Sequence, residues 1–149
     1  MKPIIVLISV FLAGIGISWL TGPEVNIALS GRIAMAIMLL FTALGHFIYT
    51  DGMMLMLPDF IPAKRTMVLL TGFIEILAAI GLLMPAMITI TGILLIIFFI
   101  LILPTNIYAA YKKVNLEKAS YTGKGLTYLW LRIPMQVFFI TWVYWFTLR

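Results

Sequence analysis

Five long apolar runs occupy most of this chain, and they constrain its fold more than any other feature of the sequence. The runs cover residues 4–20, 27–50, 66–84, 86–103 and 126–148. Because a helix rises about 1.5 Å per residue, about 17 to 20 helical residues cross the hydrocarbon core of a bilayer, which is roughly 30 Å thick. We therefore predict an all-α membrane protein with five transmembrane helices, folded as a single domain over residues 1–149.

Composition excludes several classes of protein. The sequence is 64% hydrophobic and 10% charged, whereas a soluble domain carries about a quarter charged residues. The net charge of +5 forms no basic stripe, so we expect no nucleic-acid partner. The chain has no cysteine and one histidine, His46, which excludes cysteine-ligated metal centres and a bis-histidine haem within one chain. We expect no metal and no intrinsic cofactor.

The first apolar run has two interpretations. It follows Lys2, as the apolar part of a secretory signal peptide follows a positive charge. However, residues 4–20 exceed the usual apolar length of about 7–15 residues, and Ser18-Trp19-Leu20 is not a small-residue cleavage site. We expect a true first transmembrane helix here.

Two connections between the runs differ from simple turns. Residues 51–62 are largely apolar but contain Pro58 and Pro62. Such a segment cannot span a membrane, so we expect it to be interfacial or re-entrant and covered by protein. Pro104 is expected to end the fourth helix, and residues 112–124 form the one extended polar segment.

The distribution of positive charges predicts the orientation. With five spans, the N-terminus and the connections 51–65 and 104–125 lie on the same side of the membrane. Eight of the ten lysines and arginines lie on or just inside that side, and the other two are Arg32 and Arg149. Since cytoplasmic loops are enriched in positive residues, we expect a cytoplasmic N-terminus, an external C-terminus and a location in the cell (inner) membrane.

Polar residues inside the predicted spans are the candidate functional residues, because ionisable groups in hydrocarbon are costly and face a partner in the bundle. They map to the cytoplasmic half of four spans: His46, Glu75, Asn106, Arg132 and Gln136. We expect them to line a polar pocket roofed by residues 51–62, with Glu75 paired to Arg132. Two interpretations stay open, because a buried ion pair either does chemistry or only fixes helix register.

Five short motifs, in order, resemble the DoxX family of small membrane proteins. They are Gly45-His46-Phe47, Pro58-Asp59-Phe60-Ile61-Pro62, Thr71-Gly72-Phe73-Ile74-Glu75, Leu103-Pro104-Thr105-Asn106-Ile107-Tyr108 and Leu131-Arg132-Ile133-Pro134-Met135-Gln136. Their order and spacing match over roughly residues 30–147, although Thr105 stands where a small residue such as alanine is expected. The resemblance implies a four-helix transmembrane bundle, to which residues 4–20 add an N-terminal helix. It also implies that the five candidate polar residues are the functional ones.

The resemblance implies a function as well. The family name comes from a subunit of a quinol-oxidising complex, so we expect an accessory subunit of a quinone-linked redox system that is not an enzyme on its own. A quinone or other isoprenoid lipid is the expected ligand, and a redox protein, membrane lipids and further copies of the chain in a homo-oligomer are the expected partners. The alternatives are a non-enzymatic membrane scaffold or assembly factor, and a small-solute carrier.

Overall fold

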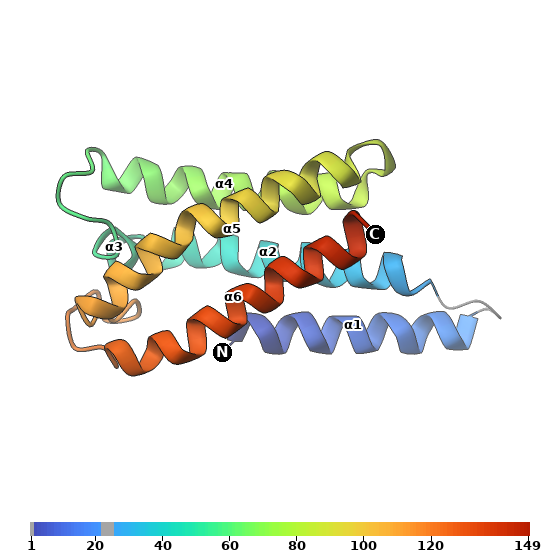
Figure 1. The fold of residues 1–149 in the computed structure, drawn as a ribbon, viewed down its shortest axis with the longest axis horizontal. Coiled ribbons are helices and arrows are strands. Elements are labelled where there is room, and N and C mark those ends of the chain that lie inside the picture. The colour runs from blue at the N-terminus through green and yellow to red at the C-terminus, as the bar shows by residue number, and fades with distance from the viewer. Residues whose placement is uncertain (1, 22–25) are drawn as a thin grey trace.

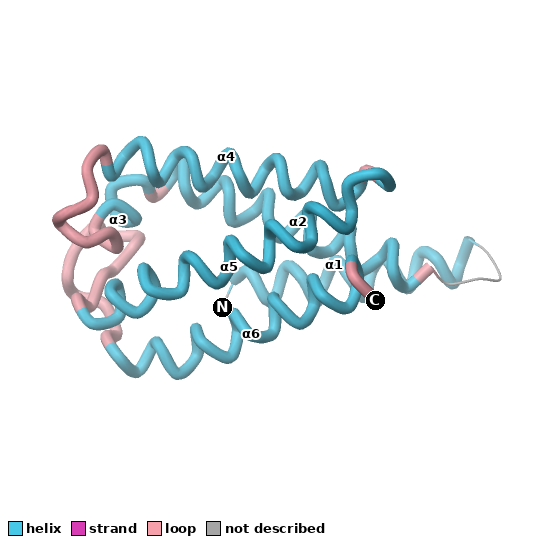
Figure 2. Tube along the Cα trace, turned by 45° about the horizontal axis from the view of Figure 1, so that its top comes forward, coloured by secondary structure: helices cyan, strands magenta, loops and turns pink. Residues whose placement is uncertain are grey.

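Five long helices form the described part of the molecule, which contains no strand (Figures 1 and 2). The structure is a computed structural model that describes residues 2–21 and 26–149. The long helices are α1 (Lys2–Thr21), α2 (Ile27–Ile48), α4 (Lys64–Leu83), α5 (Ile88–Tyr111) and α6 (Leu126–Thr147), and the short ones are α3 (Thr50–Met54) and the 3₁₀ helix η1 (Pro85–Met87). All five long helices have the length and apolar composition that a membrane crossing requires, which confirms the predicted all-α membrane architecture.

Apolar side chains cover the outside of the bundle as well as its core. Leu77 of α4 and Leu101 of α5 are 67% and 68% exposed, and both belong to faces that carry further exposed isoleucines and leucines. A soluble protein would cover such large apolar faces. In a bilayer they contact lipid, so the exposed leucines are the expected outer surface of a membrane bundle.

Helix α2 lies at the centre of the bundle. It packs against α1, α4 and α6, while α5 packs against α6 and α4. Small and flexible residues dominate its buried face: Ser30, Gly31, Ala34, Met35, Ala36, Met38, Leu39 and Ala43. Small residues favour helix association in lipid because they let the backbones approach closely.

Helix α1 lies at the edge of the bundle and is displaced along its axis. The ring of Phe11, midway along α1, lies 4.8 Å from the ring of Trp142 and 5.6 Å from the ring of Phe146, both near the end of α6. The second half of α1 therefore extends past the C-terminal end of α6 (Figure 1). Trp19 and Leu20 in this half are highly exposed, whereas Leu7 in the first half is fully buried in the core.

Pro104 does not end the fourth long helix, and that expectation was wrong. Helix α5 contains Pro104 and continues to Tyr111. A proline removes one helical hydrogen bond, but neighbouring helices in a membrane bundle satisfy the backbone groups near it. Near this position, Gln136 of α6 donates a hydrogen bond to the main-chain carbonyl of Phe99, five residues before Pro104. Asn106 consequently lies inside a helix.

The two longer connections meet at one end of the bundle. Helix α3 packs against α4, and a Cβ atom at Gly52 would collide with the backbone of Leu116 in the connection between α5 and α6. In that connection, the side chain of Asn115 accepts hydrogen bonds from the main-chain N–H groups of Glu117 and Lys118. We call this end, with α3 and residues 112–125, the α3 end.

Substitution of Gly31 tests whether α2 and α6 pack as closely as the structure shows. A Cβ atom at this position would lie 2.5 Å from the ring of Phe146, and the Gly31 carbonyl accepts a hydrogen bond from Trp142 Nε1 at 3.0 Å. We expect Gly31→Ala to lower the free energy of unfolding in detergent by about 1–3 kcal/mol. Gly16→Ala is the control, because a Cβ at Gly16 meets nothing within 4 Å. Equal effects of the two substitutions would contradict this packing.

Candidate functional site

The five candidate residues form two separate clusters. His46 of α2 meets Glu75 of α4, and we call these two with Thr71 the His46 cluster. Asn106 of α5 meets Arg132 and Gln136 of α6, and we call these three the Arg132 cluster. Within residues 2–21 and 26–149, no hydrogen bond or ion pair joins the two clusters. The sequence grouped all five residues in one pocket, whereas the structure divides them between two helix pairs.

Glu75 is paired with His46 and not with Arg132, so the expected Glu75–Arg132 pair is replaced. Nε2 of His46 lies 3.6 Å from Oε2 of Glu75, while Arg132 donates a hydrogen bond to Oδ1 of Asn106. Helix α4 packs mainly against α2, and α6 packs mainly against α5. Glu75 therefore faces α2 and Arg132 faces α5, although the sequence places both at a similar depth in the membrane.

Gly72 brings His46 close to α4. A Cβ atom at Gly72 would lie only 2.9 Å from Cβ of His46, so glycine permits the short separation of the two helices at this level. Thr71 lies one helical turn before Glu75 on the same face of α4. The side chains of His46 and Glu75 are 18% and 6% exposed, which places their contact in a poorly solvated environment.

The contacts of His46 determine which ring nitrogen carries hydrogen. Nδ1 lies 2.9 Å from the main-chain carbonyl oxygen of Val68, and a carbonyl can only accept. We therefore assign a hydrogen to Nδ1. The hydroxyl of Thr71 fits this assignment, because it lies 3.0 Å from Nδ1 and donates to the Val68 carbonyl at 2.8 Å. In the neutral ring, Nε2 then bears a lone pair.

Nε2 of His46 and Oε2 of Glu75 face each other at 3.6 Å, and the sign of this contact depends on whether a hydrogen lies between them. A lone pair on Nε2 would repel a carboxylate oxygen, and Oε2 of Glu75 has no other hydrogen-bond partner. The contact becomes attractive as imidazolium with carboxylate, or as neutral imidazole with carboxylic acid. Both forms hold the same single proton. The His46 cluster thus places an imidazole and a carboxyl group side by side within the bundle.

The Arg132 cluster is a chain of hydrogen bonds between α5 and α6. Arg132 donates to Asn106, Nδ2 of Asn106 donates to Oε1 of Gln136 at 3.1 Å, and Gln136 donates to the Phe99 carbonyl. The guanidinium group also lies over the ring of Tyr128, 5.1 Å from its centroid. The chain ties the two helices together but leaves Nε of Arg132 buried without a hydrogen-bond partner.

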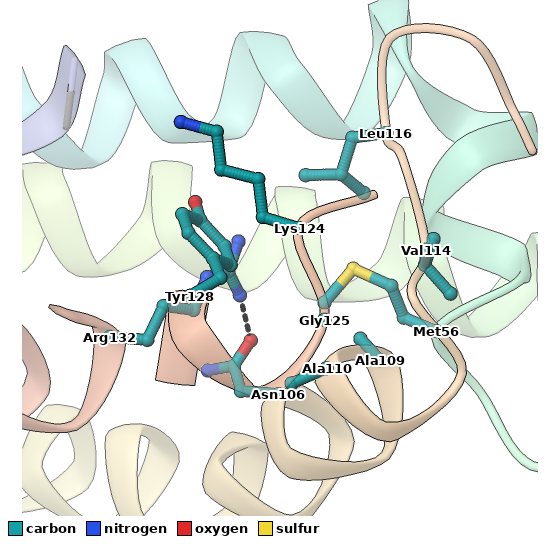
Figure 3. A pocket seen from close by; sticks show the side chains of 10 residues that line it. All are labelled: Met56, Asn106, Ala109, Ala110, Val114, Leu116, Lys124, Gly125, Tyr128 and Arg132. Atoms are coloured by element: carbon teal, nitrogen blue, oxygen red, sulfur yellow. Dashed lines mark hydrogen bonds between the residues drawn. The ribbon is translucent and has the colours of Figure 1, made fainter. Parts of the chain in front are cut away.

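A small cavity adjoins the Arg132 cluster at the α3 end (Figure 3). Asn106, Tyr128 and Arg132 line it, together with Lys124 and with Met56 from the segment 51–62. Its volume of about 30 Å³ holds about two water molecules, whereas pockets for drug-sized ligands enclose about 300 Å³ or more. The segment 51–62 thus helps to cover polar groups, but the space beneath it does not admit a quinone ring.

The sequence analysis missed three groups that belong to the two clusters or lie beside them. Thr71 carried a usable signal, because its spacing from Glu75 places both on one helical face. Lys124 was counted only among the loop charges. The carbonyl of Val68 has no signal in the sequence, since every residue has a carbonyl group and only the packing of α2 on α4 selects this one.

The comparison with protein families identifies the shared part of the chain. A family model described as a domain of unknown function, DUF8561, matches residues 35–147. The chain belongs to the DUF8561 family. The DUF8561 region includes both clusters and the helices from most of α2 to α6, and it leaves out the peripheral α1. No curated protein and no solved structure matches the chain.

Removal of His46 alone should lower the free energy of unfolding more than removal of His46 together with the charge of Glu75. His46→Ala leaves the buried Glu75 carboxyl without its partner, and we expect it to lower the free energy of unfolding by about 3 kcal/mol. Adding Glu75→Gln to His46→Ala should recover more than half of this loss. Unfolding of the single and double variants in detergent measures the coupling, and independent, additive losses would contradict the pairing.

Substitution of Gln136 tests whether the hydrogen bonds of the Arg132 cluster stabilise the DUF8561 region. Gln136→Leu leaves the Asn106 amide and the Phe99 carbonyl without this partner, so we expect the free energy of unfolding to fall by about 1–2 kcal/mol. Thr141→Val is a matched control on α6, because the Thr141 hydroxyl donates to the Val137 carbonyl of its own helix. Similar losses of unfolding free energy in both variants would show that these hydrogen bonds do not tie α5 to α6.

Proposed function

We propose that this protein is an accessory subunit of a quinone-linked redox system in the cell membrane, in which the His46 cluster exchanges a proton with a quinone headgroup. The observation that supports the proposal is the buried contact of His46 with Glu75, in which Nε2 and Oε2 face each other at 3.6 Å between two helices. Quinones take up protons together with electrons, and quinols release both. The motifs that resemble the DoxX family support the same class of function.

The quinone headgroup reaches the His46 cluster from the bilayer. The rings of Phe47 and Phe73 pack edge to face with centroids 5.4 Å apart, and they are 40% and 56% exposed. A Cβ atom at Gly72 would contact both His46 and Phe47, so these rings lie beside the cluster. Exposed aromatic rings offer a surface for a quinone ring to pack on. The Arg132 cavity is too small for this role, so the proposal uses His46 and Glu75 and not Arg132 or Gln136.

A redox partner protein supplies or removes the electrons. Two electrons and two protons convert a quinone into a quinol, and we assign both electrons to the partner, one proton to the His46 cluster and the second proton to the aqueous phase. A proton passes from the His46–Glu75 pair to a quinone oxygen, or from a quinol hydroxyl to the pair. Phe47 and Phe73 then hold the ring beside the cluster while the partner acts.

The proposed orientation places the α3 end in the cytoplasm. Nζ of Lys2 lies 3.0 Å from the Glu117 carboxylate, so the N-terminus joins the α3 end. Most lysines and arginines belong to the same end, as the positive-inside rule requires of the cytoplasmic side. The C-terminus after α6 is then outside the cell membrane.

A membrane scaffold or assembly factor is the second candidate function. The Arg132 cluster favours it, because this chain of hydrogen bonds runs from helix to helix with only about 30 Å³ of space beside it. In this function the cluster fixes α5 against α6. A partner protein would then contact the apolar outer faces of the bundle.

Quinone binding tests the first function. Wild-type protein, Glu75→Gln and the control Glu117→Gln are reconstituted in lipid nanodiscs, and the affinity for a ubiquinone analogue is measured by fluorescence quenching. We expect Glu75→Gln to weaken binding by about tenfold, as loss of a hydrogen bond to a charged group does. Glu117 is exposed and lies outside the bundle core, so its substitution should leave binding unchanged. Equal affinities of all three proteins would contradict the quinone function and favour the scaffold.

A further inference from the structure

The α3 end carries more positive charge than the carboxylates of the chain can pair. Every acidic side chain that the structure describes already faces a positive or protonatable partner. The contacts are Arg65–Asp51 at 3.9 Å, Lys64–Asp59 at 2.9 Å, Lys2–Glu117 at 3.0 Å and His46–Glu75 at 3.6 Å. The hydrogen bond from Lys64 also lowers the pKa of the Asp59 carboxyl, which keeps this exposed carboxylate charged and paired.

Several positive side chains at this end are left without a carboxylate partner among residues 2–21 and 26–149. They are Lys112, Lys113, Lys118, Lys124 and Arg132. All of them lie in the connection from α5 to α6 or in the first two turns of α6. Basic groups at the cytoplasmic surface of a membrane attract anionic lipids, so this surplus indicates a negatively charged partner.

Two of the unpaired charges converge on the cavity beside the Arg132 cluster. Lys124 and Arg132 line this cavity with Asn106 and Tyr128. Figure 3 shows the side chains of Lys124 and Tyr128 extending in the same direction, with the guanidinium of Arg132 beside the Tyr128 ring. Nε of Arg132 is buried and has no acceptor. An ammonium, a hydroxyl and an unused guanidinium N–H are donors suited to the oxygens of a phosphate.

An apolar groove lies along the same end of α5. The groove has a volume of about 700 Å³ and is lined by Ile100, Leu103, Pro104, Ile107, Tyr108, Tyr111 and Leu126. Nζ of Lys112 lies 5.8 Å from the centroid of the Tyr108 ring, so a positive charge lies beside one of the residues that line the groove. Leu126 of the groove and Lys124 of the cavity are two residues apart at the start of α6. An apolar surface for acyl chains thus lies next to positive charge for a headgroup, which is the combination that binds an anionic phospholipid.

We propose that the cavity beside Arg132 binds the phosphate of an anionic phospholipid whose acyl chains lie along the groove of α5. Arg132, Lys124 and Tyr128 donate hydrogen bonds to the phosphate oxygens, and Asn106 holds the guanidinium through its own hydrogen bond. The cavity admits two phosphate oxygens, and the rest of the headgroup remains at the surface. This site is independent of the quinone function, because it uses a different cluster on a different pair of helices.

Native mass spectrometry of the full chain in detergent tests the site. The protein is titrated separately with phosphatidylglycerol, phosphatidylcholine and inorganic phosphate. We expect wild type to retain phosphatidylglycerol at concentrations at which phosphatidylcholine does not bind. Lys124→Gln should weaken this binding about tenfold, as loss of a hydrogen bond to a charged group does, and Tyr128→Phe should weaken it as well. Both substitutions spare the hydrogen bonds among Asn106, Arg132 and Gln136, so the fold is retained.

Lys118→Gln is the matched control, because Lys118 lies in the same connection but does not line the cavity. It should change the affinity less than about twofold. Equal losses in the Lys118 and Lys124 variants would show diffuse attraction of charge and overturn the site. Equal binding of phosphatidylglycerol and phosphatidylcholine would show that the site does not select anionic headgroups, and it would overturn the proposal. Displacement of phosphatidylglycerol by millimolar inorganic phosphate would assign the site to free phosphate and overturn the lipid as its occupant.

Discussion

Polar groups inside a membrane must find their partners within the protein, and the helices of this bundle meet that requirement for most of their buried polar atoms, with Oε2 of Glu75 and Nε of Arg132 as exceptions. A polar group without a partner in an apolar environment costs about 4–8 kcal/mol on a hydrocarbon scale. Gly72 lets α2 approach α4 so that His46 meets the Val68 carbonyl and Glu75. Hydrogen bonds from Arg132 to Asn106 and onward to Gln136 join α5 to α6. Trp142 of α6 also donates a hydrogen bond to the Gly31 carbonyl of α2, and the small residues of α2 allow the apolar contacts around it to form.

The long helices could be predicted from the sequence because hydropathy alone decides which segments enter a membrane. The five predicted spans are found as five long apolar helices. Pro104 was misread, since the rule that proline ends a helix describes an isolated helix, whereas Gln136 supports the backbone of α5 here. The displacement of α1 was not predictable either, because it depends on where Phe11 meets Trp142 and Phe146.

The candidate residues were predictable as a set but not in their pairing. A buried carboxyl, an arginine and an amide are conspicuous in apolar helices, so the sequence identified them individually. Their partners depend on how far each helix is rotated about its axis, and adjacent residues differ by about 100°. Depth alone suggested Glu75 with Arg132, whereas packing of α4 on α2 directs Glu75 to His46. Two polar clusters with separate surroundings also allow two separate roles, proton exchange in one and headgroup recognition in the other.

The tautomer of His46 tests most directly whether the ring directs Nδ1 to the Val68 carbonyl and Nε2 to Glu75. His46 is the only histidine of the chain, so labelling with ¹⁵N-histidine gives one Nδ1 and one Nε2 resonance without further assignment. Nitrogen chemical shifts of the protein in lipid nanodiscs distinguish the two neutral tautomers and the imidazolium. We predict a hydrogen on Nδ1, because this atom faces the Val68 carbonyl at 2.9 Å. A neutral ring with its hydrogen on Nε2 and a bare Nδ1 would contradict this orientation of His46.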